Sequence, residues 1–368
     1  LLYFFTGKAV NSALTPSSAS SETTLLQNSF GKYGAGTLTI ASCLPLLIIA
    51  ATALLVTSGY TFNEVFLYWF PNFGFAFLLL ALLTLLQFLP VKQIHRVQLF
   101  FVSLAGMGIL ILGIYGTISP DKSMGFIFRM PEQFSASGLS SALLLLFFAG
   151  SNLLRGKEKG RPYLLGIALL VFLPWMFASL AHVNPERLAI STIPFMTASR
   201  TIMGDAGRQI MGVVVIAGSC AAFTGFTLLC RQKIEELSQN MMAPSFLAAG
   251  GQRWLLPPLI AVVAGACMAT GLAGDELLEI LLRSTLLLWL LCYCFVGVAA
   301  VFSKKSAGAA NSSVSGIAVF LLIAGFLTIL FGDPHTMELL KYITLLLLAS
   351  FSLATLLIFI HPKRKDIP

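Results

Sequence analysis

The residues Phe147–Asn152 interrupt a run of apolar residues with Gly150, Ser151 and Asn152, and binding chemistry is expected first at this interruption. The run covers Gly138–Leu154, about 17 residues against the roughly 20 that an apolar helix needs to cross a bilayer. A membrane helix broken at a glycine leaves backbone amides and carbonyls free to bind the charged groups of a small solute. The alternative is that Gly150 and Ser151 let neighbouring helices pack closely.

A second group of residues with binding chemistry is acidic and ends in an arginine. Asp275 and Glu276 open an apolar run, where the positive end of a helix dipole favours carboxylates. Glu279 and Arg283 are four residues apart and therefore share one helix face. Because Arg283 would lie roughly 10 Å into the helix, we interpret the two as a structural ion pair. A gate or a solute-orienting role is the alternative.

The sequence carries no motif for covalent chemistry, neither a phosphate loop nor a nucleophile with its base. The six cysteines fall within or at the ends of apolar runs, and Cys292 and Cys294 would point in different directions on one helix. The four histidines are far apart and form no ligand pair. We therefore expect a protein that is not an enzyme and that binds no metal and no cofactor.

The elements that must position these residues are helices in a bilayer. The chain has 368 residues, of which 57% are hydrophobic and 10% charged, whereas about 25% are charged in an ordinary soluble domain. The opening Leu1–Phe5 is too short to span a membrane, and we interpret it as the end of a helix whose beginning is missing. Ten runs of spanning length follow: Thr37–Gly59, Tyr68–Leu89, Val97–Ile118, Gly138–Leu154, Pro162–Val183, Arg208–Cys230, Trp254–Ala273, Glu276–Phe302, Val314–Phe331 and Glu338–Ile360.

The basic residues predict an orientation for these spans. Sixteen of the 23 Lys and Arg fall on one side of the predicted arrangement, the side that carries the C-terminus. Because Lys and Arg concentrate in cytoplasmic loops, the sequence predicts a cytoplasmic C-terminal tail. The net charge of +8 is then a signal for membrane orientation, and no nucleic acid is expected as a partner.

Two stretches of the sequence resemble a known family of permeases. Leu146–Asn152, followed by Arg161-Pro162, resembles the sixth span and its exit loop in the amino acid, polyamine and organocation (APC) superfamily. Ile202–Gly207, which follows Pro185–Ala189 and leads into Val213–Arg231, resembles the connection between the seventh and eighth spans. In that family a small-residue helix ends in an arginine before an amphipathic cytoplasmic segment, here Gln232–Leu247. The resemblance covers the third to the twelfth span, and helix spacing contributes more to it than identities do.

The resemblance implies an all-α, LeuT-like inverted-repeat bundle that lacks the first span and most of the second. Residues 1–36 would be the end of a truncated span and a cytoplasmic loop, 37–118 three spans of the first repeat and 138–302 the second repeat. Residues 314–361 would add two spans, and 362–368 a cytoplasmic tail. The family's substrate binds between broken first and sixth spans, and the third, eighth and tenth spans wall the site.

The resemblance also implies candidate site residues. Phe148, Ala149, Gly150 and Ser151 would present freed backbone groups to the substrate. Ser219 and Thr224 lie where sodium-coupled relatives of this fold hold the ion. The alternative for these two hydroxyls is a hydrogen bond back to the helix carbonyl four residues earlier.

From these observations we expect a secondary active transporter of the plasma (bacterial inner) membrane that works by alternating access. Its partners would be the lipid bilayer, an amino acid or related amine, and a coupling ion, H⁺ or Na⁺. The alternative is a non-transporting membrane subunit or anchor that retains the permease fold.

Overall fold

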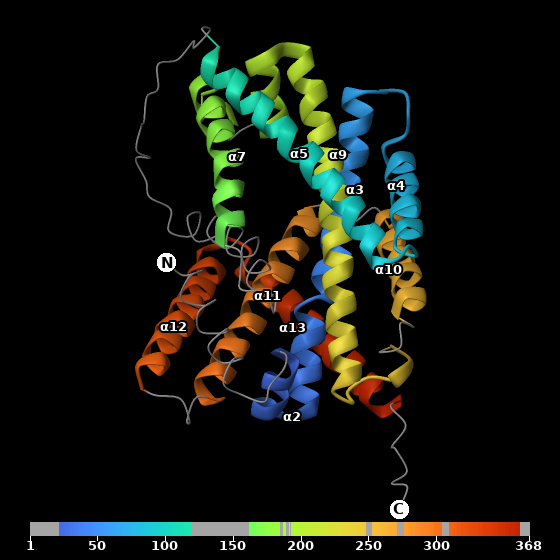
Figure 1. Cartoon of the computed structure of the whole chain (residues 1–368), viewed down its shortest axis with the longest axis vertical. Helices are drawn as coiled ribbons and strands as arrows, with labels where there is room; N and C mark the ends of the chain where they lie inside the picture. The colour runs from blue at the N-terminus through green and yellow to red at the C-terminus, as the bar shows by residue number, and fades with distance from the viewer. Residues whose placement is uncertain are drawn as a thin grey trace, which may run out of the picture. The chain divides into compact units, whose positions relative to one another are not determined.

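The structure is a computed structural model of the chain, and it describes residues 22–119, 162–184, 187–188, 191, 193–247, 252–270, 276–303 and 309–360. These residues form helices joined by short connections, and no strand occurs among them. The helices, shown in Figure 1, are α2 (Glu22–Ala41), α3 (Leu44–Val65), α4 (Asn72–Leu86), α5 (Val91–Ile118), α7 (Pro162–His182), α9 (Pro194–Gln239), α10 (Gln252–Ala269), α11 (Glu276–Ser303), α12 (Ala309–Gly332) and α13 (Thr336–Ile360).

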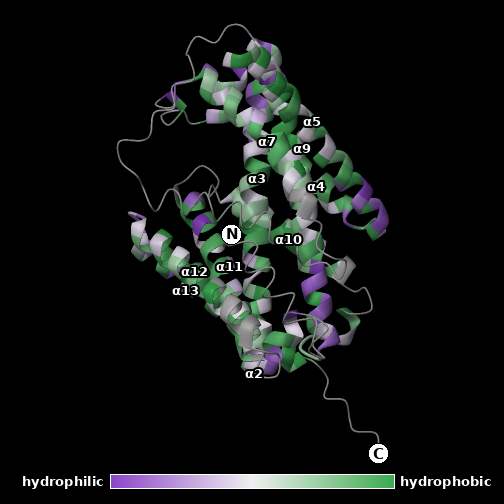
Figure 2. Cartoon of the chain, turned by 60° about the vertical axis from the view of Figure 1, so that its left-hand side comes forward, coloured by the Kyte–Doolittle hydropathy of each residue, from purple (hydrophilic) through white to green (hydrophobic). Residues whose placement is uncertain are grey.

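The helices are those of a membrane protein. In the described part of the chain, five helical segments are long and apolar enough to cross a membrane: Glu22–Val65, Val91–Ile118, Pro194–Gln239, Leu277–Phe302 and Thr336–Ile360. Eight of the ten predicted spans each overlap one described helix. Thr37–Gly59 crosses the break between α2 and α3, and Gly138–Leu154 lies outside the described residues. Figure 2 shows apolar residues along the helices and hydrophilic residues gathered near several helix ends. The helical backbone satisfies its own hydrogen bonds within each segment, as lipid requires.

The chain divides into two compact units, and each unit takes residues from both halves of the sequence. Unit 1 contains residues 1–51, 135–160 and 226–368. Within it, α11 packs against α2, α12 and α13, and α2 also packs against α13. Trp289 of α11 is fully buried in the apolar core of this unit, and Phe30 meets Phe295 edge to face with their ring centroids 5.6 Å apart. The core of unit 1 therefore lies between α2 and α11.

Unit 2 contains residues 52–134 and 161–225, and its closest helix pair is α5 with α7. Glycines make this approach close. A Cβ atom at Gly113 would lie 2.7 Å from the backbone nitrogen of Trp175, and one at Gly116 would lie 2.6 Å from the Cβ of Ala178. The buried His182 side chain is hydrogen-bonded through Nε2 to the Gly116 carbonyl at 2.8 Å. Small residues at helix contacts are typical of membrane bundles, where van der Waals packing drives association.

Helices α2 and α3 form one interrupted segment of the chain. Pro45 has no amide hydrogen to donate to the carbonyl four residues earlier, and the helix breaks at Ser42 and Cys43, just before it. A second break lies inside α2 at Gly31, whose φ of 73° and ψ of 178° are accessible to glycine almost alone. Helix α2 begins at Glu22, inside the range that the sequence predicts as a polar loop.

Helix α9 has a similar break near its beginning. Gly204 adopts φ 65° and ψ −142°, and the helix then continues without a further break to Gln239. It therefore runs through Arg231, where the resemblance implies the end of a span, and into the predicted amphipathic segment. The buried contacts of Lys233 explain this continuation, because they hold the end of α9 against the start of α2 within unit 1.

Candidate functional site

The residues expected to bind substrate, Phe148, Ala149, Gly150 and Ser151, lie outside the described residues. Their role stays a prediction from the sequence. The described residues contain the other predicted side chains and several buried polar groups.

The two hydroxyls expected near a coupling ion are both buried on α9. Thr224 Oγ1 donates to the carbonyl of Cys220, four residues earlier, at 2.7 Å, which is the back-bonded arrangement weighed as the alternative. Ser219 lies five residues before Thr224, about 140° away around the helix axis. The two side chains therefore do not face one point, and the ion site stays a prediction.

Glu279 and Arg283 do form an ion pair on α11. The structure adds a third member, Asp333, directly after the end of α12, whose Oδ2 lies 2.8 Å from Arg283 Nη1. The Asp333 side chain is only 9% exposed, whereas that of Arg283 is 47% exposed. The arginine thus ties α11 to the end of α12. A structural role is sufficient to explain the pair, and its geometry does not require a role in orienting a solute.

The buried polar group that sequence reasoning missed is an ion pair in unit 1 between α2 and α9. Lys233 Nζ lies 2.7 Å from Glu22 Oε2, and both side chains are more than nine-tenths buried, at 8% and 9% exposure. Glu236, one turn along α9, lies 3.6 Å from the same ammonium and is 30% exposed. Charges removed from water are costly unless they are paired, so each member of this pair depends on the other.

Neighbouring polar residues extend the contact between the start of α2 and the end of α9. Thr23 Oγ1 donates to Glu236 Oε2 at 2.7 Å, and Thr24 Oγ1 donates to Asn240 Oδ1 at 3.0 Å. Glu236 and Asn240 follow Lys233 at positions i+3 and i+7, so they continue one face of α9, with Asn240 directly after its last residue. Residues 22–24 at the start of α2 therefore contact the end of α9, and the break at Gly31 follows them along the chain.

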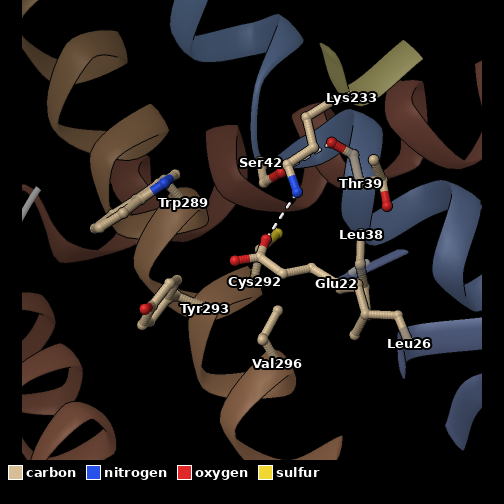
Figure 3. A pocket seen from close by; sticks show the side chains of 10 residues that line it. All are labelled: Glu22, Leu26, Leu38, Thr39, Ser42, Lys233, Trp289, Cys292, Tyr293 and Val296. Carbon is tan, nitrogen blue, oxygen red and sulfur yellow. Dashed lines mark hydrogen bonds and ion pairs between the residues drawn. The ribbon is translucent and has the colours of Figure 1, made fainter. Parts of the chain in front are cut away.

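A small cavity lies beside the ion pair. Its lining comes from three elements of unit 1, α2 with the turn that follows it, α9, and α11: Glu22, Leu26, Leu38, Thr39, Ser42, Lys233, Trp289, Cys292, Tyr293 and Val296. Its volume of about 10 Å³ is at the lower limit of what one water molecule requires. Figure 3 shows Glu22 and Lys233 reaching toward one another from different helices, with Trp289 and Tyr293 projecting from α11.

One cavity-lining hydroxyl is available for a ligand. Thr39 is 3% exposed, and its Oγ1 has no hydrogen-bond partner among the residues that the structure describes. A buried hydroxyl without a partner is costly, which favours a polar occupant of the cavity. The cavity thus combines an ammonium, a carboxylate and a hydroxyl beside an aromatic wall, and the Glu236 carboxylate lies 3.6 Å from the ammonium. These groups can bind a small charged molecule.

The sequence contained a signal for this site, although a weak one. Lys233, Glu236 and Asn240 form a polar face at helical spacing, and Glu22, Thr23 and Thr24 form a polar cluster. Each group alone is typical of a solvent-exposed surface, and only the fold brings the two faces together.

Comparison with known proteins adds no identification: neither a protein-family model nor a curated protein matches this chain. The described part of the chain is an all-α protein with several helices of membrane-spanning length.

Proposed function

We propose that the protein is a secondary transporter of amino acids or related amines, with the inverted-repeat fold of the APC superfamily, and that it works by alternating access. The observation that carries this proposal is the position of the buried ion pair and its cavity. The cavity lies among α2, α9 and α11. Of its lining, Leu38, Thr39 and Ser42 fall in the predicted third span and Trp289 to Val296 in the predicted tenth, whereas Lys233 directly follows the predicted eighth. The resemblance implies that these three spans wall the substrate site.

A repeated helix break supports the inverted-repeat fold. In the segment Glu22–Val65 a glycine with positive φ, Gly31, stands 34 residues before the last residue. In α9 the corresponding glycine, Gly204, stands ten residues after Pro194 and 35 before Gln239. Each is followed by a second glycine three positions later. Internal similarity between two halves is the mark by which transporter repeats are recognised.

The chemistry of the site supports a small charged solute. Charged side chains buried away from water are costly, so a buried ion pair beside a cavity is a candidate site for a charged solute. Here the buried ammonium and carboxylate stand beside a hydroxyl whose partner is missing among the described residues. In a protein that only anchored a complex, apolar packing would serve better than a buried ion pair.

Transport by the full-length protein in liposomes tests the proposal. We expect uptake of a radiolabelled amino acid mixture above that of empty liposomes, and we expect Gly150→Leu to abolish it with expression unchanged. Gly166→Leu is the matched control, because Gly166 on α7 has open space where a Cβ would stand. No uptake under either an H⁺ or an Na⁺ gradient would leave the membrane-anchor alternative, and equal uptake by the Gly150→Leu protein would reject the predicted site.

A further inference from the structure

We propose that Cys43 and Cys230 form a reversible redox pair, in which hydrogen peroxide joins the two sulfurs in a disulfide that ties the turn between α2 and α3 to α9. The observation that carries this inference is a contact between two thiols inside unit 1. The Cys230 thiol donates to Cys43 Sγ, with the two sulfurs 3.6 Å apart, and both residues belong to unit 1. This chemistry is independent of whether the protein transports a solute.

Cys43 is placed so that its sulfur can move to bonding distance. A disulfide holds its sulfurs about 2.05 Å apart, so the two must approach by about 1.5 Å. Ser42 and Cys43 form a turn that belongs to neither α2 nor α3, and a connecting turn shifts more readily than the helices it joins. The Cys43 thiol itself donates to the Thr39 carbonyl at 3.3 Å, so its sulfur is the acceptor that faces Cys230.

Oxidation of the pair by hydrogen peroxide balances without a further reagent. Cys43 is 5% exposed and follows Ser42, which lines the cavity, whereas Cys230 is fully buried, so peroxide reaches Cys43 first. The Cys43 sulfur attacks one peroxide oxygen, the O–O bond breaks, and a sulfenic acid and one water form. The Cys230 sulfur then attacks the sulfenic sulfur, the S–O bond breaks, and the disulfide and a second water form. Peroxide thus takes up the electrons and protons that the two thiols lose.

The position of the pair along the predicted spans favours a switch over a permanent bridge. Cys43 lies near the start of Thr37–Gly59 and Cys230 at the end of Arg208–Cys230, and the basic residues predict that both of these ends face the cytoplasm. Cytoplasmic reductants keep thiols reduced, and the disulfides that form there are usually transient, catalytic or redox-sensing. We therefore expect free thiols at rest, as in the structure, and a disulfide under oxidising conditions.

The bridge would join two parts of the chain that are 187 residues apart. One end is the break between α2 and α3, and the other lies three residues before Lys233, whose ammonium pairs with Glu22. A disulfide restricts the unfolded chain more strongly when it closes a longer loop. Oxidation should therefore make the protein more resistant to unfolding.

Peptide mapping of the purified full-length protein in detergent micelles tests the inference. The reduced protein is exposed to hydrogen peroxide, alkylated with N-ethylmaleimide in denaturant and digested without reductant. We expect a peptide that links Cys43 to Cys230, about tenfold more abundant than any other cysteine pairing, because contact between reacting groups raises their effective concentration. Dithiothreitol should remove this link. Unfolding the protein in sodium dodecyl sulfate before peroxide is added should abolish the preference.

Two variants separate the pair from the other cysteines. Cys230→Ala leaves the Cys43 sulfenic acid without its resolving thiol, so peroxide should convert Cys43 to oxygen acids only. Cys220→Ala is the matched control, because Cys220 is also buried on α9, at 2% exposure, and it should leave the linked peptide unchanged. Peroxide should raise the sodium dodecyl sulfate fraction at the midpoint of unfolding in the unsubstituted protein and in Cys220→Ala, but not in Cys230→Ala.

An unmodified Cys43 after peroxide treatment, or oxygen acids at Cys43 without a linked peptide, would overturn the inference. Links that form equally among the six cysteines of the folded protein would do the same. A linked peptide that leaves the unfolding midpoint unchanged would reject the claim that the bridge ties the turn to α9.

Discussion

Replacing Lys233 with the uncharged side chain of methionine should destabilise the protein strongly, although it changes the side-chain volume little. The substitution leaves the Glu22 carboxylate, 9% exposed, without the ammonium 2.7 Å away. Breaking a buried pair by removing one partner costs about 3–5 kcal/mol. Glu22→Gln should cost less, about 1–3 kcal/mol, because Lys233 keeps Glu236 at 3.6 Å.

The double variant, Glu22→Gln with Lys233→Met, should recover much of that loss. It leaves no charge buried without a partner, and replacing a whole buried pair by neutral groups is often close to neutral in free energy. We expect the double variant to be about 2 kcal/mol more stable than Lys233→Met alone. A double variant that is more stable than Lys233→Met alone would identify the broken ion pair as the cause of the lost stability.

The free energy of unfolding can be measured in mixed micelles by titration with sodium dodecyl sulfate, with the fluorescence of tryptophan as the signal. Lys341→Met is the matched control, because Lys341 is exposed on α13 and its ammonium lies 5.7 Å from the ring centroid of Tyr342. That control should change stability by about 0.5–1 kcal/mol. Equal small losses for Lys233→Met and Lys341→Met, or strictly additive losses in the double variant, would refute the buried-pair reasoning.

Two further predictions test the glycines. Gly113→Ala should destabilise the α5–α7 contact by about 1–3 kcal/mol, because the new Cβ would lie 2.7 Å from the Trp175 backbone nitrogen. Gly106→Ala on the same helix meets open space and should be neutral or stabilising. Equal unfolding midpoints for the two variants would contradict the close α5–α7 packing. Gly31→Ala meets no atom within 4 Å but must hold φ at +73°, so it should cost about 1–3 kcal/mol. Gly218→Ala, also in open space with no positive φ, should stabilise by about 0.4–1 kcal/mol, and a Gly31 variant that unfolds like the Gly218 variant would show that the break is not required.

The helices could be predicted because an apolar run long enough to cross a membrane is visible directly in the sequence. The predicted Val97–Ile118 and Glu338–Ile360 lie within α5 and α13, since a run of about 20 apolar residues in lipid has no satisfactory backbone arrangement other than a helix. Boundaries were less predictable. Tyr68–Leu89 is expected as a span, whereas α4 begins only at Asn72, after Pro71.

The site was less predictable than the helices. Lys233 lies in a stretch that the sequence predicts as amphipathic, and a lysine in such a stretch normally faces water. Its burial depends on Glu22, which is 211 residues away in the sequence, and no local pattern reports such a pairing. The Glu279–Arg283 contact was predictable because its members are one helical turn apart, yet their partner Asp333 was not, for the same reason of distance along the chain.

The most direct test of the central claim, that the cavity lies on the path of a transported solute, is uptake after thiol modification at the cavity wall. Two proteins are compared in liposomes, one with Cys292 as its sole cysteine and one with Cys294, which lies roughly 160° away around α11. Both cysteines are buried in the structure, but only Cys292 lines the cavity. A charged thiol reagent added during amino acid uptake should abolish transport by the Cys292 protein and leave that by the Cys294 protein intact. Unchanged uptake with Cys292 fully modified would contradict the account.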